Sequence, residues 1–327
     1  MPEKLYSSTF KISNTAVIIS TDDEMLHNGI RNWLNTFNAD FHEYEDAVKI
    51  KILGLHKSNT MPIPIPENAR CIYEGHTARY LTNNHIWYFE IPEIGRMAID
   101  LNNKEINACA YVENIFSEAW HLQDFMHPLF ELLRMEELYL FHSGAVCIDN
   151  WGLMLAGRSG RGKSTLSLHL LANGFSFMSD DRCFIERTKT GYDLTGFLEP
   201  VKFWPQNVKH ITSINNIEQS GQNDKTVIDI KDYFPYSISK KCTLKAIIFP
   251  RWCPGKSSRL EAIKPAKAIV EILPLTMECL FSNTSKKHFE FNCELVERLP
   301  MAILTLGKDK SVWHKLIRSF LVNGVVQ

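Results

Sequence analysis

"GRSGRGKSTLSLHLLANGFSFMSDD", residues 157–181, decides how the second half of this chain folds. The stretch opens with the pattern G-x-x-x-x-G-K-[ST], follows the apolar run "GLMLA" (152–156) and continues into an apolar-periodic helical segment. A strand, a glycine-rich turn and a helix in this order form a cradle whose backbone N–H groups and helix N-terminus hold phosphate oxygens. We therefore predict a nucleotide site made of Gly157, Ser159, Gly160, Arg161, Gly162, Lys163, Ser164 and Thr165.

Two adjacent carboxylates, Asp180 and Asp181, end the same stretch. The predicted helix over 164–173 climbs about 15 Å from the phosphates at 1.5 Å per residue. Gly174 suits a left-handed C-cap, and the strand "FSFMS" (175–179) returns about 16 Å. Because the two lengths nearly cancel, an ordinary parallel crossover brings both aspartates level with the phosphates. The alternative is that the pair only caps a helix or forms a turn.

A histidine reaches the same place from the other side of the loop. "HSGAVCIDNWGLMLAG" (142–157) predicts a hairpin that turns over residues 149–152. Counting outward pairs Ile148 with Leu153, Val146 with Leu155 and Gly144 with Gly157. His142 then lies beside the loop. The alternative is that it has only a structural role, with its hydrogen bonds made within the hairpin.

These groups suit phosphoryl transfer. Lys163 can reach the outer phosphates, and one carboxylate can hold Mg²⁺ together with Ser164. The other carboxylate can accept the proton of an attacking hydroxyl, because the carboxylate beside it raises its pKa. His142 would either orient this carboxylate or stabilise its charge.

The region around these residues resembles the HPr kinase/phosphorylase family and its HPr-kinase-related relatives. The resemblance rests on His142, the glycine-rich loop, its helix, "SDDRCFIE" (179–186) and the tail "VERLPMAILTLGKD" (296–309). It implies an α/β P-loop kinase domain of the HPr kinase / phosphoenolpyruvate carboxykinase type that uses ATP and Mg²⁺. By the same analogy Asp181 is the base assisted by His142, Lys163 binds the phosphates, and Ser164 and Asp180 hold the metal.

The resemblance also implies the substrate class, a serine hydroxyl in a small protein or precursor peptide. Relatives that phosphorylate lasso-peptide precursors make peptide tailoring the favoured role. A small-molecule hydroxyl such as free serine is the nearest competing acceptor. Two further functions stay open, an ATP-binding regulatory protein without transfer activity and a P-loop ATPase coupled to mechanical or transport work.

The chain departs from the family at the second signature, E-I-R-G-L-G. Here "FLEPVKFWPQ" (197–206) keeps a Leu-Glu and loses the glycines, which puts HPr as substrate and any phosphorylase activity in doubt. Several nearby residues have two interpretations each. Glu199 is a second metal ligand or none, and Lys202 contacts a phosphate or is a solvated strand lysine. One of Arg251, Lys256 and Arg259 would contact the transferred phosphate. Arg158 and Arg161 either neutralise the charge of the bound phosphates or are ordinary exposed loop residues. Trp204 and Trp252 are expected to be packing residues.

The rest of the chain predicts two domains. Residues 1–115 are rich in strand-forming runs such as "IWYFEI" (86–91) and predict a β-rich domain, which would recognise the substrate. Residues 116–327 would form the kinase domain with its connecting helices, the first of them broken at Pro128. The segment 206–226 is polar and predicts a loop.

Composition narrows the classes of binding partner and the cellular compartment that the sequence predicts. The formal net charge is −1, so nothing favours nucleic acid, and no apolar run is long enough to span a membrane. The first residues lack the apolar core of a signal peptide, and the eight cysteines are scattered without a C-x-x-C pair. We expect a cytoplasmic protein with no nucleic-acid or membrane partner, and a homo-oligomer stays open.

Overall fold

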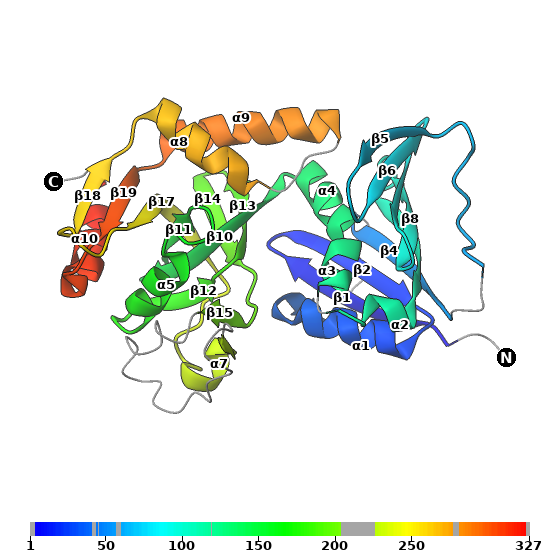
Figure 1. Cartoon of the computed structure of the whole chain (residues 1–327), viewed down its shortest axis with the longest axis horizontal. Helices are drawn as coiled ribbons and strands as arrows, with labels where there is room; N and C mark the ends of the chain where they lie inside the picture. Colours follow the sequence, from blue (N-terminus) through cyan, green and yellow to red (C-terminus); the bar gives the residue numbers. More distant parts are fainter. Residues whose placement is uncertain are drawn as a thin grey trace. The chain divides into compact units, whose positions relative to one another are not determined.

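The computed structural model describes residues 4–40, 44, 46–56, 60–118, 120–203, 226–276 and 281–324. The chain divides into two compact units. The first unit comprises Met1–Glu137 and Cys279–Thr284, and the second comprises Leu138–Glu278 and Ser285–Gln327. The part of the first unit up to Glu137 runs from blue to green in Figure 1, and its residues 281–284 are orange.

The first unit is built on a nine-stranded sheet with the order β3-β1-β2-β4-β9-β8-β7-β6-β5. The β2–β4 and β4–β9 pairs are parallel and the others are antiparallel. Its strands are β1 (Tyr6–Ile12), β2 (Thr15–Thr21), β3 (Asn38–Ala39), β4 (Val48–Leu55), β5 (Arg70–Glu74), β6 (Arg79–Asn83), β7 (Ile86–Ile91), β8 (Gly95–Asp100) and β9 (Glu105–Tyr111).

Four helices accompany this sheet, and three of them set the boundary of the unit. The helices are α1 (Glu24–Trp33), α2 (Val112–Ile115), α3 (His121–Phe125) and α4 (His127–Met135). The ring of Phe130 on α4 packs edge-on against Trp33, and His127 Nδ1 lies 2.9 Å from Tyr80 Oη. These contacts explain why the unit runs to Glu137, whereas the sequence pattern predicted a boundary at 115/116. Pro128 lies in the first turn of α4, where its missing N–H costs nothing.

The second unit has an eight-stranded sheet that closes on itself. The path β11-β10-β13-β14-β17 returns to β11 through an additional β11–β17 pairing, so five strands form a ring, and β19 and β18 extend it from β17. Its strands are β10 (Leu138–Ile148), β11 (Trp151–Ala156), β12 (Ser176–Ser179), β13 (Arg182–Thr188), β14 (Gly191–Gly196), β17 (Lys241–Trp252), β18 (Arg259–Ala262) and β19 (Met301–Leu306). A separate ribbon pairs β15 (Val201–Phe203) with β16 (Thr226–Ile228).

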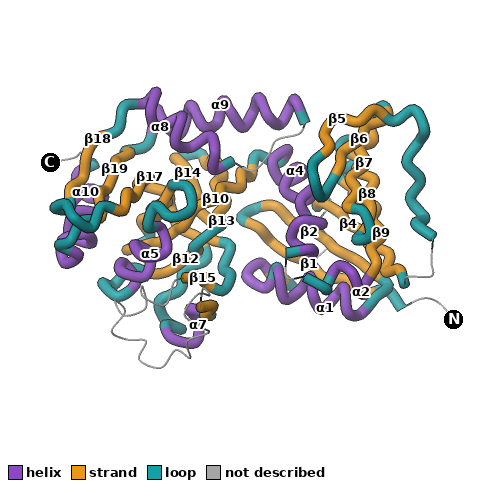
Figure 2. The backbone as a smooth tube through the Cα atoms, viewed as in Figure 1, coloured by secondary structure: helices purple, strands orange, loops and turns teal. Residues whose placement is uncertain are grey.

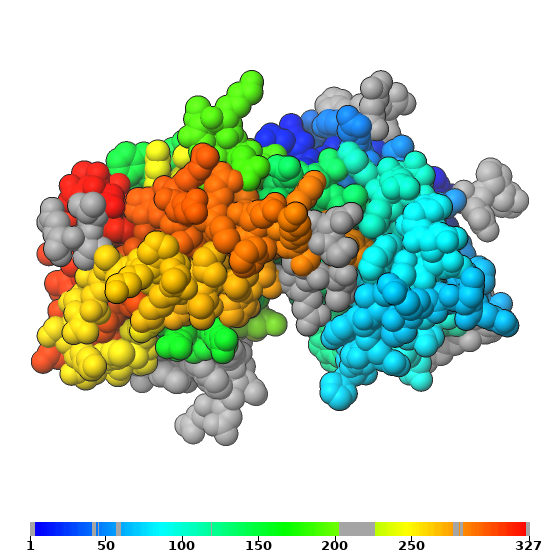
Figure 3. All heavy atoms as spheres, turned by 90° about the horizontal axis from the view of Figure 1, so that it is seen from above, coloured from blue at the N-terminus to red at the C-terminus, as the bar shows by residue number. Residues whose placement is uncertain are grey.

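Four helices cover the two faces of these strands, α5 (Lys163–Leu171), α8 (Pro265–Ile272), α9 (Ser282–Arg298) and α10 (Trp313–Asn323). The short helix α7 (Ile230–Tyr233) packs instead in a separate cluster with α5 and the β15–β16 ribbon. On one face α5 and α10 bury Leu166, Trp313 and Ile317 against β11, β17 and β19. On the other face α8 and α9 bury Ile272, Phe291 and Leu295 against the remaining side of the strands. Figure 2 shows this sequence of helices and strands along the tube, and Figure 3 shows the yellow and orange residues of α8 and α9 forming one surface of the unit.

The structure is therefore mixed α/β, as expected for residues beyond 140. Most predicted helices and strands are present within a few residues of their predicted bounds. Most of the polar segment 206–226, and Trp204 before it, lie outside the described residues. Searching the described part of the chain finds no helix with the length and hydrophobicity to cross a membrane.

Candidate active site

The site is built around the loop 157–162, which joins β11 to α5. Gly160 and Gly162 adopt φ values of +80° and +98°, in the left-handed region that side chains disfavour. Gly162 is also the N-cap of α5, and a Cβ there would come within 2.7 Å of Leu306 Cδ1. The loop thus needs glycine at these two positions to bring its backbone around to the start of the helix.

Lys163 is the first residue of α5 and is buried. Its Nζ donates a hydrogen bond of 2.6 Å to the carbonyl oxygen of Gly157, across the mouth of the loop. The side chains of Arg158, Ser159 and Arg161 are exposed, and Thr165 is half-buried. The ammonium group is therefore held over the N-terminal end of α5, where the helix dipole and free N–H groups already favour an anion.

The two aspartates return to this end of α5 and separate there. Strand β12 runs antiparallel to β10, which is antiparallel to β11, so β12 is parallel to β11 and ends near the loop. Asp180 Oδ2 accepts a hydrogen bond of 2.8 Å from Ser164 Oγ. The predicted length match between helix and return strand is thus confirmed, and it places a carboxylate on the helix start.

Asp181 faces a different partner. Its Oδ1 lies 3.3 Å from His142 Nδ1, and the two side chains are 59% and 44% exposed. Strand register explains the contact, because His142 pairs with Arg182 at the start of β13, directly after Asp181. The structure therefore places Asp180 with Ser164, and Asp181 with His142.

The environment keeps the imidazole neutral near pH 7. Partial burial lowers the pKa of the half-buried His142 below its usual 6.5, and the charges of Lys163 and Arg182 lower it further, while Asp181 raises it. In the tautomer with its proton on Nδ1, the neutral ring donates to Asp181. This arrangement orients the carboxylate without cancelling its charge.

The predicted hairpin register is wrong by two residues. The turn consists of Asp149 and Asn150 alone, with φ values of +49° and +63°, and Val146 pairs with Leu153 instead of Leu155. Aspartate and asparagine tolerate the left-handed conformation, and a two-residue turn of this kind matches the twist of the strands. The shorter turn ends the β10–β11 pairing at Ser143 and Ala156, which still brings His142 to the loop.

Other predicted residues have different partners from those expected. Glu199, predicted as a second metal ligand, is the ion-pair partner of Arg182, whose Nε donates to Oε2 at 2.9 Å. Arg251, predicted to touch the transferred phosphate, pairs with Glu271 of α8 at 2.9 Å. Arg259 pairs with Glu261, and Lys202 is exposed on β15. These partners differ from the predicted metal and phosphate contacts, and the predicted roles of the four residues stay predictions.

Sequence reasoning missed Arg182. Its guanidinium lies over the Phe197 ring at 4.7 Å, holds Glu199 and lowers the pKa of His142. The sequence did carry a signal for Arg182, because this residue directly follows the aspartate pair in "SDDRCFIE".

The donor set at Ser164 and Asp180 fits Mg²⁺. Both groups offer oxygen, which this cation prefers, and Mg²⁺ commonly takes one or two protein ligands and completes its shell with water and substrate phosphates. Among the described residues, no group of three or more His, Cys, Asp or Glu side chains gathers around a common point.

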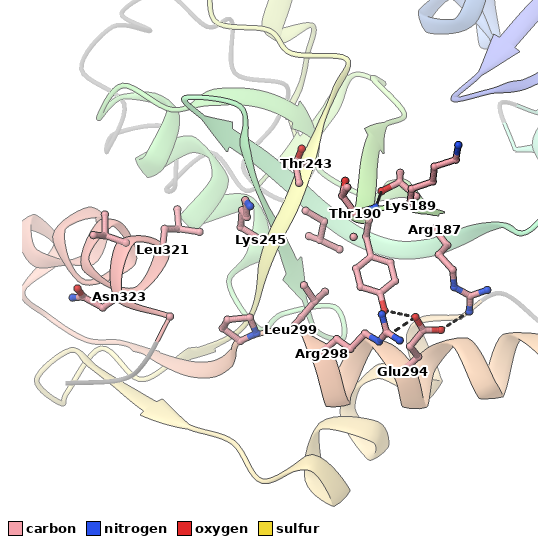
Figure 4. Close-up of a pocket in the computed structure, with 17 residues that line it drawn as sticks. Arg187, Lys189, Thr190, Thr243, Lys245, Glu294, Arg298, Leu299, Leu321 and Asn323 are labelled. Carbon is pink, nitrogen blue, oxygen red and sulfur yellow. Dashed lines mark hydrogen bonds and ion pairs between the residues drawn. The ribbon is translucent and has the colours of Figure 1, made fainter.

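A cavity of about 790 Å³ lies elsewhere in the second unit (Figure 4). It is lined at the first residues of β17 by Thr243 and Lys245, and Pro300, just before β19, lines it as well. Glu294 at its wall accepts from Tyr192 at 2.7 Å and pairs with Arg187 and Arg298. The cavity is at the opposite ends of the strands from the loop, and Glu294 already engages two of its arginines. We therefore do not place the nucleotide there.

Comparisons with known proteins add little to this geometry. No family model matches the chain, and no curated protein matches it either. Among solved structures 96 chains match, and one of them is the HPr(Ser) kinase/phosphatase from Coxiella burnetii. That match has 14% identity and a TM-score of 0.32, and it covers 56% of this chain and 96% of the other. A likeness this distant carries no conclusion about the activity or about the role of any residue.

Proposed function

We propose that this protein is an ATP- and Mg²⁺-dependent kinase that transfers the γ-phosphate to a serine hydroxyl, as the resemblance to HPr kinases implies. One observation carries the proposal. A glycine-rich loop with a buried lysine stands beside two aspartates that have separate partners, Ser164 for Asp180 and His142 for Asp181. A protein that only binds nucleotide has no need of a proton acceptor, which is the role proposed for Asp181 in its pair with His142.

The transfer follows from these positions. Lys163 exchanges the carbonyl of Gly157 for phosphate oxygens when the nucleotide enters the loop. The acceptor oxygen attacks the γ-phosphorus while its proton passes to Asp181, and the bond from the γ-phosphorus to the bridging oxygen breaks, so ADP leaves with that electron pair. Neutral His142 holds Asp181 in place throughout the step. Ser164 and Asp180 would hold Mg²⁺, which when bound neutralises charge on the phosphates.

The proposed acceptor is a serine in a small protein or precursor peptide, with peptide tailoring as the favoured role. The exposure of Asp181 supports this choice, because a proton acceptor open to solvent can be reached by a residue on another chain. We also propose that the first unit recognises the substrate.

The experiment is transfer from γ-labelled ATP, with Mg²⁺, to HPr, to free serine and to peptides encoded beside the gene, read by intact mass. We expect a phosphate adduct on a peptide or protein serine. Asp181→Asn should bind ATP and transfer nothing, whereas Lys163→Ala should lose both. Asp232→Asn, an exposed aspartate on α7, is the matched control and should transfer as the wild type does.

Three outcomes would change the proposal. Full transfer by Asp181→Asn would remove that residue as the base. An adduct on free serine alone would make the protein a small-molecule kinase. ATP bound and intact with every acceptor would instead favour a regulatory nucleotide-binding protein.

A further inference from the structure

Trp252 lies against the glycine-rich loop, although the sequence marked it only as a packing residue. It is the last residue of β17, the parallel neighbour of β11, with Leu155 paired to Ile248. A Cβ on Gly162 would be 3.9 Å from both Cβ and Cε3 of Trp252. The indole therefore stands beside the N-terminus of α5, at the carboxyl ends of the strands where ligands of α/β sheets bind.

The two flanks of β11 carry different groups at this end. His142 comes from β10, and the aspartates follow β12, on the flank where β10 pairs with β11. Trp252 comes from β17, on the opposite flank. Because the transferred phosphate must face Asp181, the remainder of the nucleotide extends away from it, towards β17.

The indole is held in place and partly open to solvent. It is 40% exposed, and its ring meets Trp313 edge-on at 6.2 Å. Trp313 is fully buried, and its Nε1 donates to Ser258 Oγ at 2.8 Å. A large aromatic side chain that already packs against a buried neighbour can accept a flat partner with little further loss of conformational freedom on binding.

From these positions we infer that Trp252 is the surface on which the nucleobase of the bound nucleotide stacks. The inference rests on the proposed function, and it names which side of the loop receives the nucleoside. Stacking on an aromatic ring engages the face of the base and not its hydrogen-bonding edge, so it strengthens binding of ATP and GTP alike.

The test compares ATP with inorganic tripolyphosphate, which has no base, by calorimetric titration. Trp252→Ala should weaken ATP binding about tenfold and leave tripolyphosphate binding unchanged. Trp252→Phe, which keeps an aromatic ring, should recover most of the loss. Trp151→Ala is the matched control, because Trp151 is 37% exposed at the far end of β11. It should bind both ligands as the wild type does.

A fluorescence measurement guards against a variant that folds poorly. ATP should quench wild-type tryptophan emission, tripolyphosphate should not, and the quench should be absent in Trp252→Phe. If Trp252→Ala binds ATP as tightly as the wild type, the inference is overturned while the nucleotide site stands. Equal weakening of ATP and tripolyphosphate would also overturn it, since the indole would then only shape the loop. A wild-type protein that binds neither ligand would instead overturn the proposed function.

Discussion

At the scale of single residues, the pair formed by His142 and Asp181 has a charge state that can be measured. Burial, Lys163 and Arg182 lower the pKa of His142, and Asp181 opposes them. We expect the imidazole to titrate below pH 6.5 by NMR and, in Asp181→Asn, at a still lower pH, because the one charge that raises its pKa is gone. The variant His142→Asn, which lacks the ring, assigns the imidazole resonance.

Phosphate transfer should fall as pH drops through the wild-type midpoint, since a protonated His142 ring weakens Asp181 as a base. A midpoint at or above 6.5 would contradict this account.

A second histidine makes the first unit sensitive to acid. Burial, with the charge of Arg134, lowers the pKa of His127 to about 4. The unfolded chain takes up this proton near pH 6.5, so it binds more protons than the folded state between the two values. Stability should therefore fall by about 3 kcal/mol as pH drops from 6.5 to 4. Urea unfolding at several pH values should show a smaller loss for His127→Gln, whose amide can still bond Tyr80. His85→Gln, an exposed histidine of the same unit, should leave the loss in place.

At the scale of elements, two glycines in the loop before α5 should differ in how much free energy of unfolding is lost when each is replaced by alanine. Gly160→Ala meets no atom within 4 Å and bears only the left-handed backbone, about 1 kcal/mol. Gly162→Ala bears the same strain and also meets Leu306 at 2.7 Å, so it should cost a further 1–3 kcal/mol, about the penalty of overpacking. Thermal unfolding should rank the variants in that order. Gly255→Ala, which has open space, is the control and should melt close to the wild type. Equal losses at 160 and 162 would show that Leu306 simply moves aside.

The same elements show which parts of the fold were predictable. The return of Asp180 to Ser164 depends on a helix rise and a strand rise, both local quantities, and it was predicted from residue counts. The register of the β10–β11 hairpin depended on whether two or four residues form the turn, and the sequence allowed both. The pairings of Glu199 with Arg182 and of Arg251 with Glu271 depend on how distant strands and helices pack, which no local pattern encodes. The closure of five strands into a ring was missed for the same reason.

At the scale of the whole molecule, the chain leaves the first unit after Glu137 and returns to it for Cys279–Thr284. Phe281 is buried there, with its ring 4.2 Å from that of Trp87. Thr284 Oγ1 donates to Glu131 at 3.3 Å, and Glu131 pairs with buried Arg134 at 2.6 Å. A short segment far along the sequence is thus part of the core of the first unit, while the proposed nucleotide site lies entirely in the second.

This division predicts that two perturbations act on different units. Phe281→Ala should destabilise the first unit by about 3 kcal/mol, the usual loss for a buried phenylalanine, and leave the affinity for ATP unchanged. ATP at a hundred times its Kd should stabilise the second unit by about 2.7 kcal/mol, because a ligand stabilises only the unit that binds it.

Hydrogen exchange read segment by segment separates the effects. Phe281→Ala should speed exchange in β6–β8, and ATP should slow it in α5 and β12. Phe289→Ala, on an exposed face of α9, is the control and should change neither. Protection of β1–β9 by ATP would show instead that nucleotide binding is coupled to the first unit.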